Sequence, residues 1–306
     1  MALLTAICVP RSRAIMAKQL DYIVKDDENG LPVKTVLSHC LYLSRREISR
    51  LKFSHGLLIN GQSVRVTEAV HAGDVIHLVF PEYDTAKAER VMGKPDILYE
   101  DEDLVIVNKP SGMPCHPSHE HLDDDMGTLL TSYYHHAFPI RAIGRLDKDV
   151  SGVMLYAKNQ PAAARLSRER KDGVLEKQYM AIAQGIFTKK KDRVTYRLAK
   201  VPGRKDRVID EKGQLCITDY EVVQEVNGLS VVKIHIVTGR THQIRAGMAY
   251  LGHPLVGDGL YGGDTARLNR PALHCEQLTL KQPFTGKTIS VSAGLRADMQ
   301  ALLVVR

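Results

Sequence analysis

A polar turn followed directly by a short apolar strand, between Gly144 and Asn159, constrains the fold of this chain most strongly. The stretch reads GRLDKDVSGVMLYAKN, and its apolar part, Gly152 to Ala157, predicts a buried strand. Asp147 stands in the turn between Arg145 and Lys148. A nearby cation favours the charged form of a carboxyl group, so we expect Asp147 to be ionised at neutral pH. Such an aspartate is either a turn-forming residue or a nucleophile.

The length and composition predict a folded protein of about two domains. The chain has 306 residues, 44% of them hydrophobic, which is ample for a packed core. Its five cysteines are far apart and include no Cys-x-x-Cys pair, which argues against a disulfide framework and favours the reducing cytoplasm. No run approaches about 18 consecutive apolar residues, so no membrane span is expected. Residues 1–18 are expected to form a flexible tail, because their basic residues follow the apolar run, the reverse of a secretory leader.

The positive charge is concentrated in one segment. Between Arg165 and Lys212 there are 15 Lys and Arg against 7 Asp and Glu, whereas the rest of the chain holds 27 against 28. A basic segment of this kind fits a polyanionic partner such as nucleic acid, with Lys189 to Lys191 as candidate phosphate contacts. A solvated, solubilising face is the alternative.

The first predicted domain covers residues 19–84. Leucine and isoleucine at helical spacing indicate two short helices, the second capped by Ser44 and beginning at Arg45. Asn60-Gly61 between apolar pairs predicts a hairpin, and Val75 to Phe80 predicts a strand. The polar segment that ends at Pro95 predicts a linker, placed at residues 85–95.

The second predicted domain covers residues 96–306 and combines many strands with a few helices. A helix is predicted over Gln160 to Lys171, with Pro161 in its first turn and Gly173 just beyond its end. A second helix is predicted over Thr241 to Leu251. Strands are predicted over the segments 97–99, 104–108, 152–157, 175–184, 220–226, 230–237, 273–281 and 287–292. This pattern indicates an α+β domain with a mixed, largely antiparallel central sheet.

Four ordered motifs of this domain resemble the RluA-type RNA pseudouridine synthases. They are NKPSGMPCHP from Asn108, RLD at Arg145 followed by Ser151-Gly152, KQY from Lys177, and TGRTHQIR from Thr238 followed by LGHPLVGD. The resemblance covers nearly all of residues 96–292. It implies the pseudouridine synthase catalytic fold and an enzyme that isomerises uridine in RNA.

The resemblance also implies roles for individual residues. Asp147 is the expected nucleophile, and whether it attacks C1′ of the sugar or C6 of the base stays open. Arg245 is expected to pair with Asp147 through bidentate hydrogen bonds, and Tyr179 to stack on the displaced base and help remove the C5 proton. Arg145 is expected to fill the gap left by the flipped nucleotide. Further RNA contacts are expected from Lys109, His116, Arg240, His242 and Gln243.

Two positions depart from the pattern of that family. It commonly has His before Arg-Leu-Asp and Thr before Ser-Gly, whereas this chain has Gly144 and Val150. Neither residue supplies the nucleophile, so we expect activity to survive. Some loop contacts with RNA are expected to differ.

The segment from Leu43 to Val64 resembles the small S-four-type RNA-binding domain. In that domain a Ser-Arg opening, a basic helix and an Asn-Gly hairpin form the RNA face, which binds structured RNA through phosphates and shape. An amphipathic helix with exposed basic residues is the alternative. The matching residues are Ser44, Arg45, Arg46, Arg50 and Lys52.

The cluster of Cys115, His116, His119 and His121 raises the question of a metal site. These residues lie on one short segment without the distant second pair that a structural zinc site needs. We therefore expect no metal.

The sequence as a whole predicts a cytoplasmic, monomeric RNA pseudouridine synthase. It needs no cofactor because the reaction is redox-neutral, and its partner is structured RNA, either ribosomal or transfer RNA. A catalytically silent RNA-binding or ribosome-assembly protein is the main alternative, and a metal-dependent hydrolase is a distant third.

Overall fold

The computed structural model describes residues 19–43, 48, 51–52, 54–79, 93–116, 124–135 and 137–304. The chain forms two compact units, Met1–Asp84 with His136–Phe138, and Thr85–His135 with Pro139–Arg306. The predicted tail, nearly all of the predicted linker and most of the predicted second helix lie outside the described residues. The predicted domain boundaries therefore stay predictions. In the described part of the chain, no helix is long and apolar enough to cross a membrane.

The first unit is a small antiparallel sheet packed on a helix. The strands β1 (Gln19–Ile23), β2 (Leu57–Ile59), β3 (Gln62–Ser63) and β4 (Val75–Val79) pair in the order β1-β4-β2-β3. Asn60 and Gly61 both have positive φ, 51° and 81°, and they join β2 to β3. This is the turn that matches the right-handed twist of two strands, and it confirms the predicted hairpin. The helix α1 (Val33–His39) packs on this sheet through Val36 and Leu37, and a short 3-10 turn, η1 (Asp26–Glu28), precedes it.

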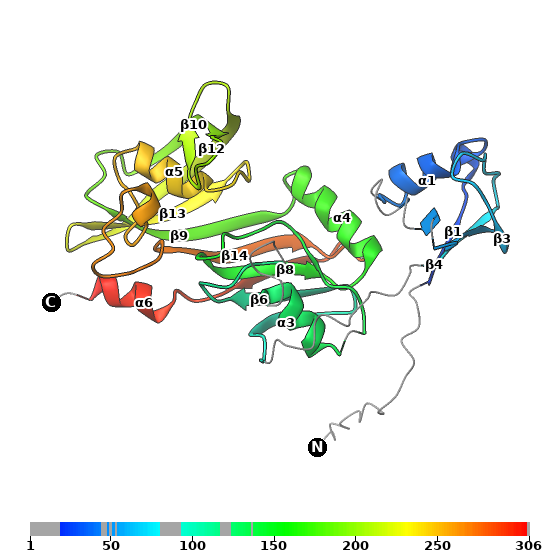
Figure 1. Ribbon diagram of the computed structural model, residues 1–306, viewed down its shortest axis with the longest axis horizontal. Helices are drawn as coiled ribbons and strands as arrows, with labels where there is room; N and C mark the ends of the chain where they lie inside the picture. Colours follow the sequence, from blue (N-terminus) through cyan, green and yellow to red (C-terminus); the bar gives the residue numbers. More distant parts are fainter. Residues whose placement is uncertain are drawn as a thin grey trace, which may run out of the picture. The chain divides into compact units, whose positions relative to one another are not determined.

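The second unit is built on one large sheet, with the strand order β11-β10-β12-β13-β9-β14-β8-β6-β5 along its main path (Figure 1). Of the strand pairs described, β8 with β14 is parallel and the others are antiparallel. The predicted α+β class with a mixed, largely antiparallel sheet is thus confirmed. The strands are β5 (Ile97–Glu100), β6 (Leu104–Lys109), β7 (Arg141–Ala142), β8 (Ser151–Ala157), β9 (Glu176–Gln184), β10 (Lys191–Lys200), β11 (Arg207–Ile209), β12 (Gln214–Val226), β13 (Leu229–Ile236), β14 (Leu273–Lys281) and β15 (Thr288–Ser292).

The helices of this unit contribute apolar side chains to its core. α4 (Gln160–Lys171) has the predicted bounds, because Asn159 caps its first turn by accepting a hydrogen bond from the backbone N–H of Ala162. In Figure 1, α4 and α5 (Gln243–Tyr250) lie on the upper side of the sheet and α6 (Ala297–Gln300) on the lower side. The remaining helical segments are α3 (Met126–Tyr133), η2 (Gly259–Tyr261) and η3 (Ala301–Leu303).

The strand β8 lies at the centre of the core, and Gly152 explains how it pairs with β14. All seven residues of β8 are buried. Gly152 has φ +117° and stands opposite Cys275 in the parallel pair, where an added Cβ would lie 2.2 Å from the carbonyl oxygen of Cys275. Next to it, the Ser151 hydroxyl lies 2.9 Å from Nδ1 of the buried His274. The Ser-Gly pair after the aspartate turn is therefore required by the close approach of two strands.

We expect Gly152→Ala to lower the free energy of unfolding by about 3 kcal/mol, because it adds steric overlap to an unfavourable backbone conformation. The measurement is urea denaturation followed by circular dichroism. Gly228→Ala is the matched control, because Gly228 has φ +72° but open space around its Cβ position. The control should lose only about 1 kcal/mol. Equal losses in the two variants would refute the steric explanation.

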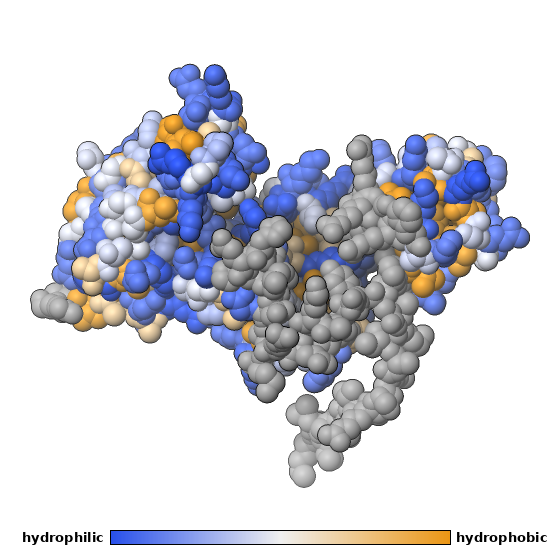
Figure 2. Space-filling view, in the orientation of Figure 1, coloured by the Kyte–Doolittle hydropathy of each residue, from blue (hydrophilic) through white to orange (hydrophobic). Residues whose placement is uncertain are grey.

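The strand β10 was not predicted from sequence, because its basic residues obscured its alternation. Its side chains alternate between exposed and partly or fully buried, and Tyr196 and Leu198 reach the core of this part of the sheet. At the top of the view in Figure 2, the surface formed by the ends of β10 and β12 is hydrophilic. The part of the basic segment in and just after β10 thus has a hydrophilic surface at this end of the sheet.

Candidate active site

A cavity of about 710 Å³ opens in the second unit beside the aspartate turn. Its walls come from the turn before β8, from β9, from the end of β13 with the loop that follows, and from the start of α5. Asp147, Tyr179 and Arg245 all line it, as do the predicted RNA contacts Arg145, His116, Arg240, His242 and Gln243. Segments separated by about a hundred residues in sequence therefore line the same cavity.

Asp147 points into this cavity from a tight turn. Its backbone carbonyl accepts a hydrogen bond from the N–H of Val150, and its side chain is 27% exposed. The carboxylate oxygen Oδ2 lies 3.4 Å from Nη1 of Arg245 and 3.8 Å from Nε2 of His242. The neighbouring Arg145 forms no ion pair with Asp147 in the described structure and donates to the hydroxyl of Thr241 at 3.2 Å. The cation beside Asp147 is thus the guanidinium of α5, rather than the adjacent basic residue that the sequence suggested.

Arg245 holds a second carboxylate more tightly than it holds Asp147. Its Nε and Nη2 donate to the two oxygens of Asp258, both at 2.7 Å, and Asp258 is buried. The predicted bidentate pairing of Arg245 with Asp147 is therefore wrong, since the fork is occupied by Asp258 and one long contact remains for Asp147. Burial lowers the pKa of Arg245, but the hydrogen bonds and charge of Asp258 outweigh it and raise the pKa above its ordinary value. Asp258 thus fixes the guanidinium that faces the nucleophile.

His242 approaches Asp147 because its backbone is left-handed, with φ +58°, immediately before α5. Its Nδ1 lies 2.9 Å from the hydroxyl of Tyr261, and that hydroxyl accepts the backbone N–H of Arg207 at 2.7 Å. Burial lowers the pKa of His242, which favours the neutral ring. With Nδ1 accepting from Tyr261, the neutral ring carries its proton on Nε2, the atom that faces Asp147.

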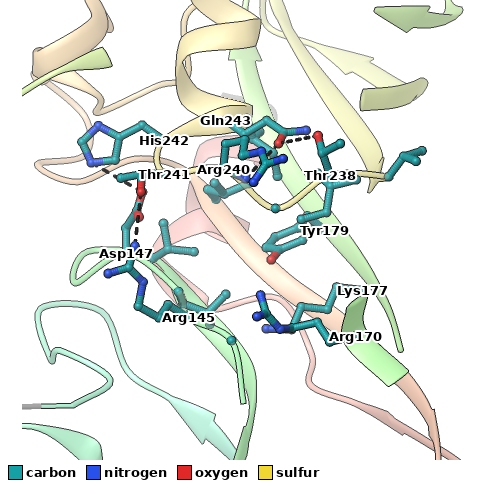
Figure 3. A pocket seen from close by; sticks show the side chains of 18 of the residues that line it. Arg145, Asp147, Arg170, Lys177, Tyr179, Thr238, Arg240, Thr241, His242 and Gln243 are labelled. Carbon is teal, nitrogen blue, oxygen red and sulfur yellow. Dashed lines mark hydrogen bonds and ion pairs between the residues drawn. The ribbon is translucent and has the colours of Figure 1, made fainter. Parts of the chain in front are cut away.

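Tyr179 forms an aromatic wall opposite the carboxylate, as Figure 3 shows. It lies in β9 between Ile234 of β13 and Cys275 of β14, and it is only 5% exposed. Burial, reinforced by nearby acidic groups, raises the pKa of its phenol well above the ordinary value. The phenol therefore stays protonated and offers an apolar face and a hydrogen-bond donor.

Two predicted RNA contacts are buried and fully occupied within the protein. Lys109 has no exposed surface, and its ammonium donates to the carbonyls of Pro110, Met113 and Lys148 at 2.7–3.0 Å. Burial lowers its pKa to about 8. The prediction that Lys109 contacts RNA is therefore wrong, because the side chain connects the loop after β6 to the turn that carries Asp147.

Gln243 is the second of these. Its amide oxygen accepts from the hydroxyl of Thr238 and the N–H of Arg240, and its amide nitrogen donates to Ile217 and Thr218. All four of its hydrogen-bonding positions are used. The predicted RNA contact of Gln243 is thus also wrong, and the side chain instead shapes the loop that presents Thr241 and His242.

The other predicted contacts stay predictions. Arg145, His116 and Arg240 are exposed at the rim of the cavity, where RNA could reach them. In the first unit, Lys52 is exposed, whereas Ser44, Arg45, Arg46 and Arg50 lie outside the described residues.

Cys115 serves the structure and is not available as a metal ligand. It is buried, and its sulfur lies 3.2–3.3 Å from the backbone oxygen and nitrogen of Leu146, beside the aspartate turn. His119 and His121 lie outside the described residues. No group of three metal-ligating side chains occurs within the ranges that the structure describes.

The sequence did not reveal Asp258, Tyr261, Arg170 and Lys177 as residues of the site. Asp258 and Tyr261 lie at and just beyond the end of the LGHPLVGD motif, which gave no signal of a partner for Arg245. Lys177 stands in the KQY motif, where the tyrosine two positions later carried the functional signal. Arg170 lies in the last turn of α4, where a basic residue is ordinarily explained by the helix dipole.

Known proteins similar to this chain carry the same activity in their names. The family model described as RNA pseudouridylate synthase matches residues 103–250. The uncharacterized RNA pseudouridine synthase YjbO of Bacillus subtilis is 34% identical over 86% of this chain and 95% of its own length. The ribosomal large subunit pseudouridine synthase D of Pasteurella multocida is 32% identical over 80% of this chain and 81% of its own.

A solved structure shows the same fold. The human RNA pseudouridylate synthase domain containing 1 superposes with a TM-score of 0.57 at 24% identity, over 68% of this chain and 84% of that protein. The sequence matches extend along almost the whole of the YjbO relative, and most of the residues that line the cavity lie within the matched family region. The chain belongs to the RNA pseudouridine synthase family, as its RluA-type motifs predicted, and it is an enzyme that isomerises uridine in RNA.

Proposed function

We propose that this enzyme converts uridine to pseudouridine in structured ribosomal RNA, with Asp147 as the nucleophile. The observation that carries the proposal is the position of Asp147 at 3.4 Å from the fixed guanidinium of Arg245, facing the wall of Tyr179. The choice of ribosomal RNA is supported by the similar protein of Pasteurella multocida, which is named for the large ribosomal subunit.

The reaction needs a carboxylate and a pocket that retains the base, and the site offers Asp147 beside a cavity. The bond between N1 of uracil and C1′ of the ribose breaks, the base rotates and a bond from C5 to C1′ forms. Water or Asp147 takes the C5 proton, and N1 gains a proton, so that the product is an isomer of uridine. A carboxylate oxygen of Asp147 forms a transient covalent bond to the nucleotide, at C1′ or at C6, and is released when the product forms. The cavity holds the base in place between these steps, which keeps the recombination intramolecular.

Three residues around Asp147 have separate roles in the reaction. Arg245 orients Asp147 through the contact of its Nη1 with Oδ2, and its own orientation is set by Asp258. Tyr179 stacks against the base, and its protonated phenol donates a hydrogen bond instead of acting as the base for the C5 proton. Arg145, exposed at the rim, occupies the space that the flipped nucleotide leaves in the RNA.

The remaining parts of the proposal concern the whole chain. The first unit acts as an S-four-type RNA-binding domain, supported by its basic segment at 45–52 and the confirmed Asn60-Gly61 hairpin. The enzyme acts as a cytoplasmic monomer without cofactor.

The test of the substrate is pseudouridine mapping in total RNA from cells with and without this chain. We expect one or more pseudouridines to disappear from large-subunit ribosomal RNA and to return when the wild-type chain is supplied. A chain carrying Asp147→Asn is the matched control and should not restore them. Loss confined to transfer RNA would refute the ribosomal substrate but keep the activity.

A further inference from the structure

Lys177 presents its ammonium to the cavity without an anionic partner in the described structure. The residue lies in β9, lines the cavity and is only 8% exposed. Within the described residues its side chain forms no hydrogen bond or ion pair. An unpaired cation that lines a cavity can form charge-assisted hydrogen bonds with an anionic group of a substrate bound there.

Arg170 places a second cation beside it. It extends from the last turn of α4 into the same cavity, and in the described part of the chain it also forms no hydrogen bond or ion pair. Gly144 lies next to both, because a Cβ built there would lie 3.3 Å from Cδ of Arg170 and 3.9 Å from Nζ of Lys177. Figure 3 shows the two side chains next to each other, reaching into the pocket.

Many other basic residues between Arg165 and Lys212 form ion pairs with carboxylates. Lys189 pairs with Asp192, Lys190 with Glu225, and Lys191 with Glu221. Arg193 and Arg204 hold Asp219 and Asp206 through two hydrogen bonds each. Glu176 lines the cavity but forms no ion pair with Lys177 or Arg170 in the described structure. Lys177 and Arg170 differ from these five residues, because they line the cavity and have no carboxylate partner in the described structure.

We propose that Lys177 and Arg170 form a subsite for a phosphate group next to the flipped uridine. The proposal rests on the proposed function, because the anion is taken to be a phosphate of the RNA substrate. Two adjacent cations repel each other, and one phosphodiester accepts hydrogen bonds from both through its two free oxygens. The apolar wall of Tyr179 and Leu273 takes the base, so the charged corner is left for the backbone.

Gly144 leaves space for this subsite, because it has no side chain. It is the position at which the chain departs from the histidine common in its family, and with φ +76° it favours glycine. A larger side chain would press on Arg170 and stand beside the ammonium of Lys177. Glycine in place of that histidine thus leaves the two cations open to the cavity.

Uridine, uridine 5′-monophosphate and uridine 3′-monophosphate are suitable probes, because they need no knowledge of the target RNA. Dissociation constants are measured by NMR titration of the full chain. We expect one monophosphate to bind wild type at least about tenfold more tightly than uridine, as a charge-assisted contact implies. In Lys177→Met and in Arg170→Gln this advantage should fall to about threefold or less. Lys177→Arg should restore it, and Lys171→Gln, next to Arg170 but outside the cavity, should leave it unchanged.

The variants also separate this subsite from the proposed nucleophile. Asp147→Asn should keep the preference for the monophosphate, so turnover by that variant would refute the role of Asp147 without affecting the subsite. Equal binding of uridine and both monophosphates to wild type would overturn the subsite. So would an unchanged preference in Lys177→Met that is shown to be folded by circular dichroism.

Discussion

Asp147→Asn should release no tritium from RNA that carries 5-tritiated uridine, a loss of at least about 10⁴-fold in kcat relative to wild type. The amide keeps the size and shape of the side chain but cannot form the covalent bond to the nucleotide. The amide oxygen can still accept a hydrogen bond from Arg245 Nη1, which lies 3.4 Å from Oδ2 in the wild type. Tritium release reports the loss of the C5 proton, so the assay follows the step that defines the product.

Asp149→Asn is the control for this prediction. It removes the other carboxylate of the same turn, and Asp149 does not line the cavity. The control should keep tritium release within about threefold of wild type, since changes outside the reacting groups usually have small effects. Binding of RNA by Asp147→Asn, measured by filter retention, should also stay near the wild-type level. Measurable turnover in Asp147→Asn would exclude Asp147 as the nucleophile.

Local signals were enough to predict much of the fold. The helix from Gln160 to Lys171 is bounded as predicted, because its cap, proline and glycine all act within a few residues. The same holds for the hairpin at Asn60-Gly61, where positive φ is a local requirement. The helix α5 begins at Gln243, two residues later than predicted, because His242 adopts a left-handed conformation.

These local signals could not predict which side chains contact each other across long distances in the sequence. The position of Asp147 could be inferred from its motif, but nothing in the sequence showed that Asp258 would occupy the fork of Arg245. Lys109 and Gln243 were predicted to contact RNA because polar residues within the family's motifs suggest function. Their burial depends on three backbone carbonyls in one case and on a four-bond network in the other, which only the folded chain reveals.

Asp258→Asn should lower the free energy of unfolding by about 3 kcal/mol, because it removes one partner of a buried ion pair and leaves Arg245 with only its long contact to Asp147. Both side chains are nearly inaccessible to solvent, with exposures of 8% for Arg245 and 1% for Asp258. Urea denaturation measures the loss. Asp298→Asn is the matched control, because Arg270 and Asp298 form the same two-bond geometry with Asp298 44% exposed. An exposed pair of this kind contributes only about 1 kcal/mol or less.

The combined variant Arg245→Met with Asp258→Leu separates stability from positioning. Replacing both members of a buried pair by apolar residues restores much of the lost stability, since no uncompensated charge remains. Tritium release should nevertheless stay at least about 100-fold below wild type, because Asp147 has lost the guanidinium that orients it. If the combined variant recovered both stability and turnover, Arg245 would be a structural residue only. A loss of stability in Asp258→Asn no larger than that of Asp298→Asn would show that the pair does not carry the buried charge as the geometry implies.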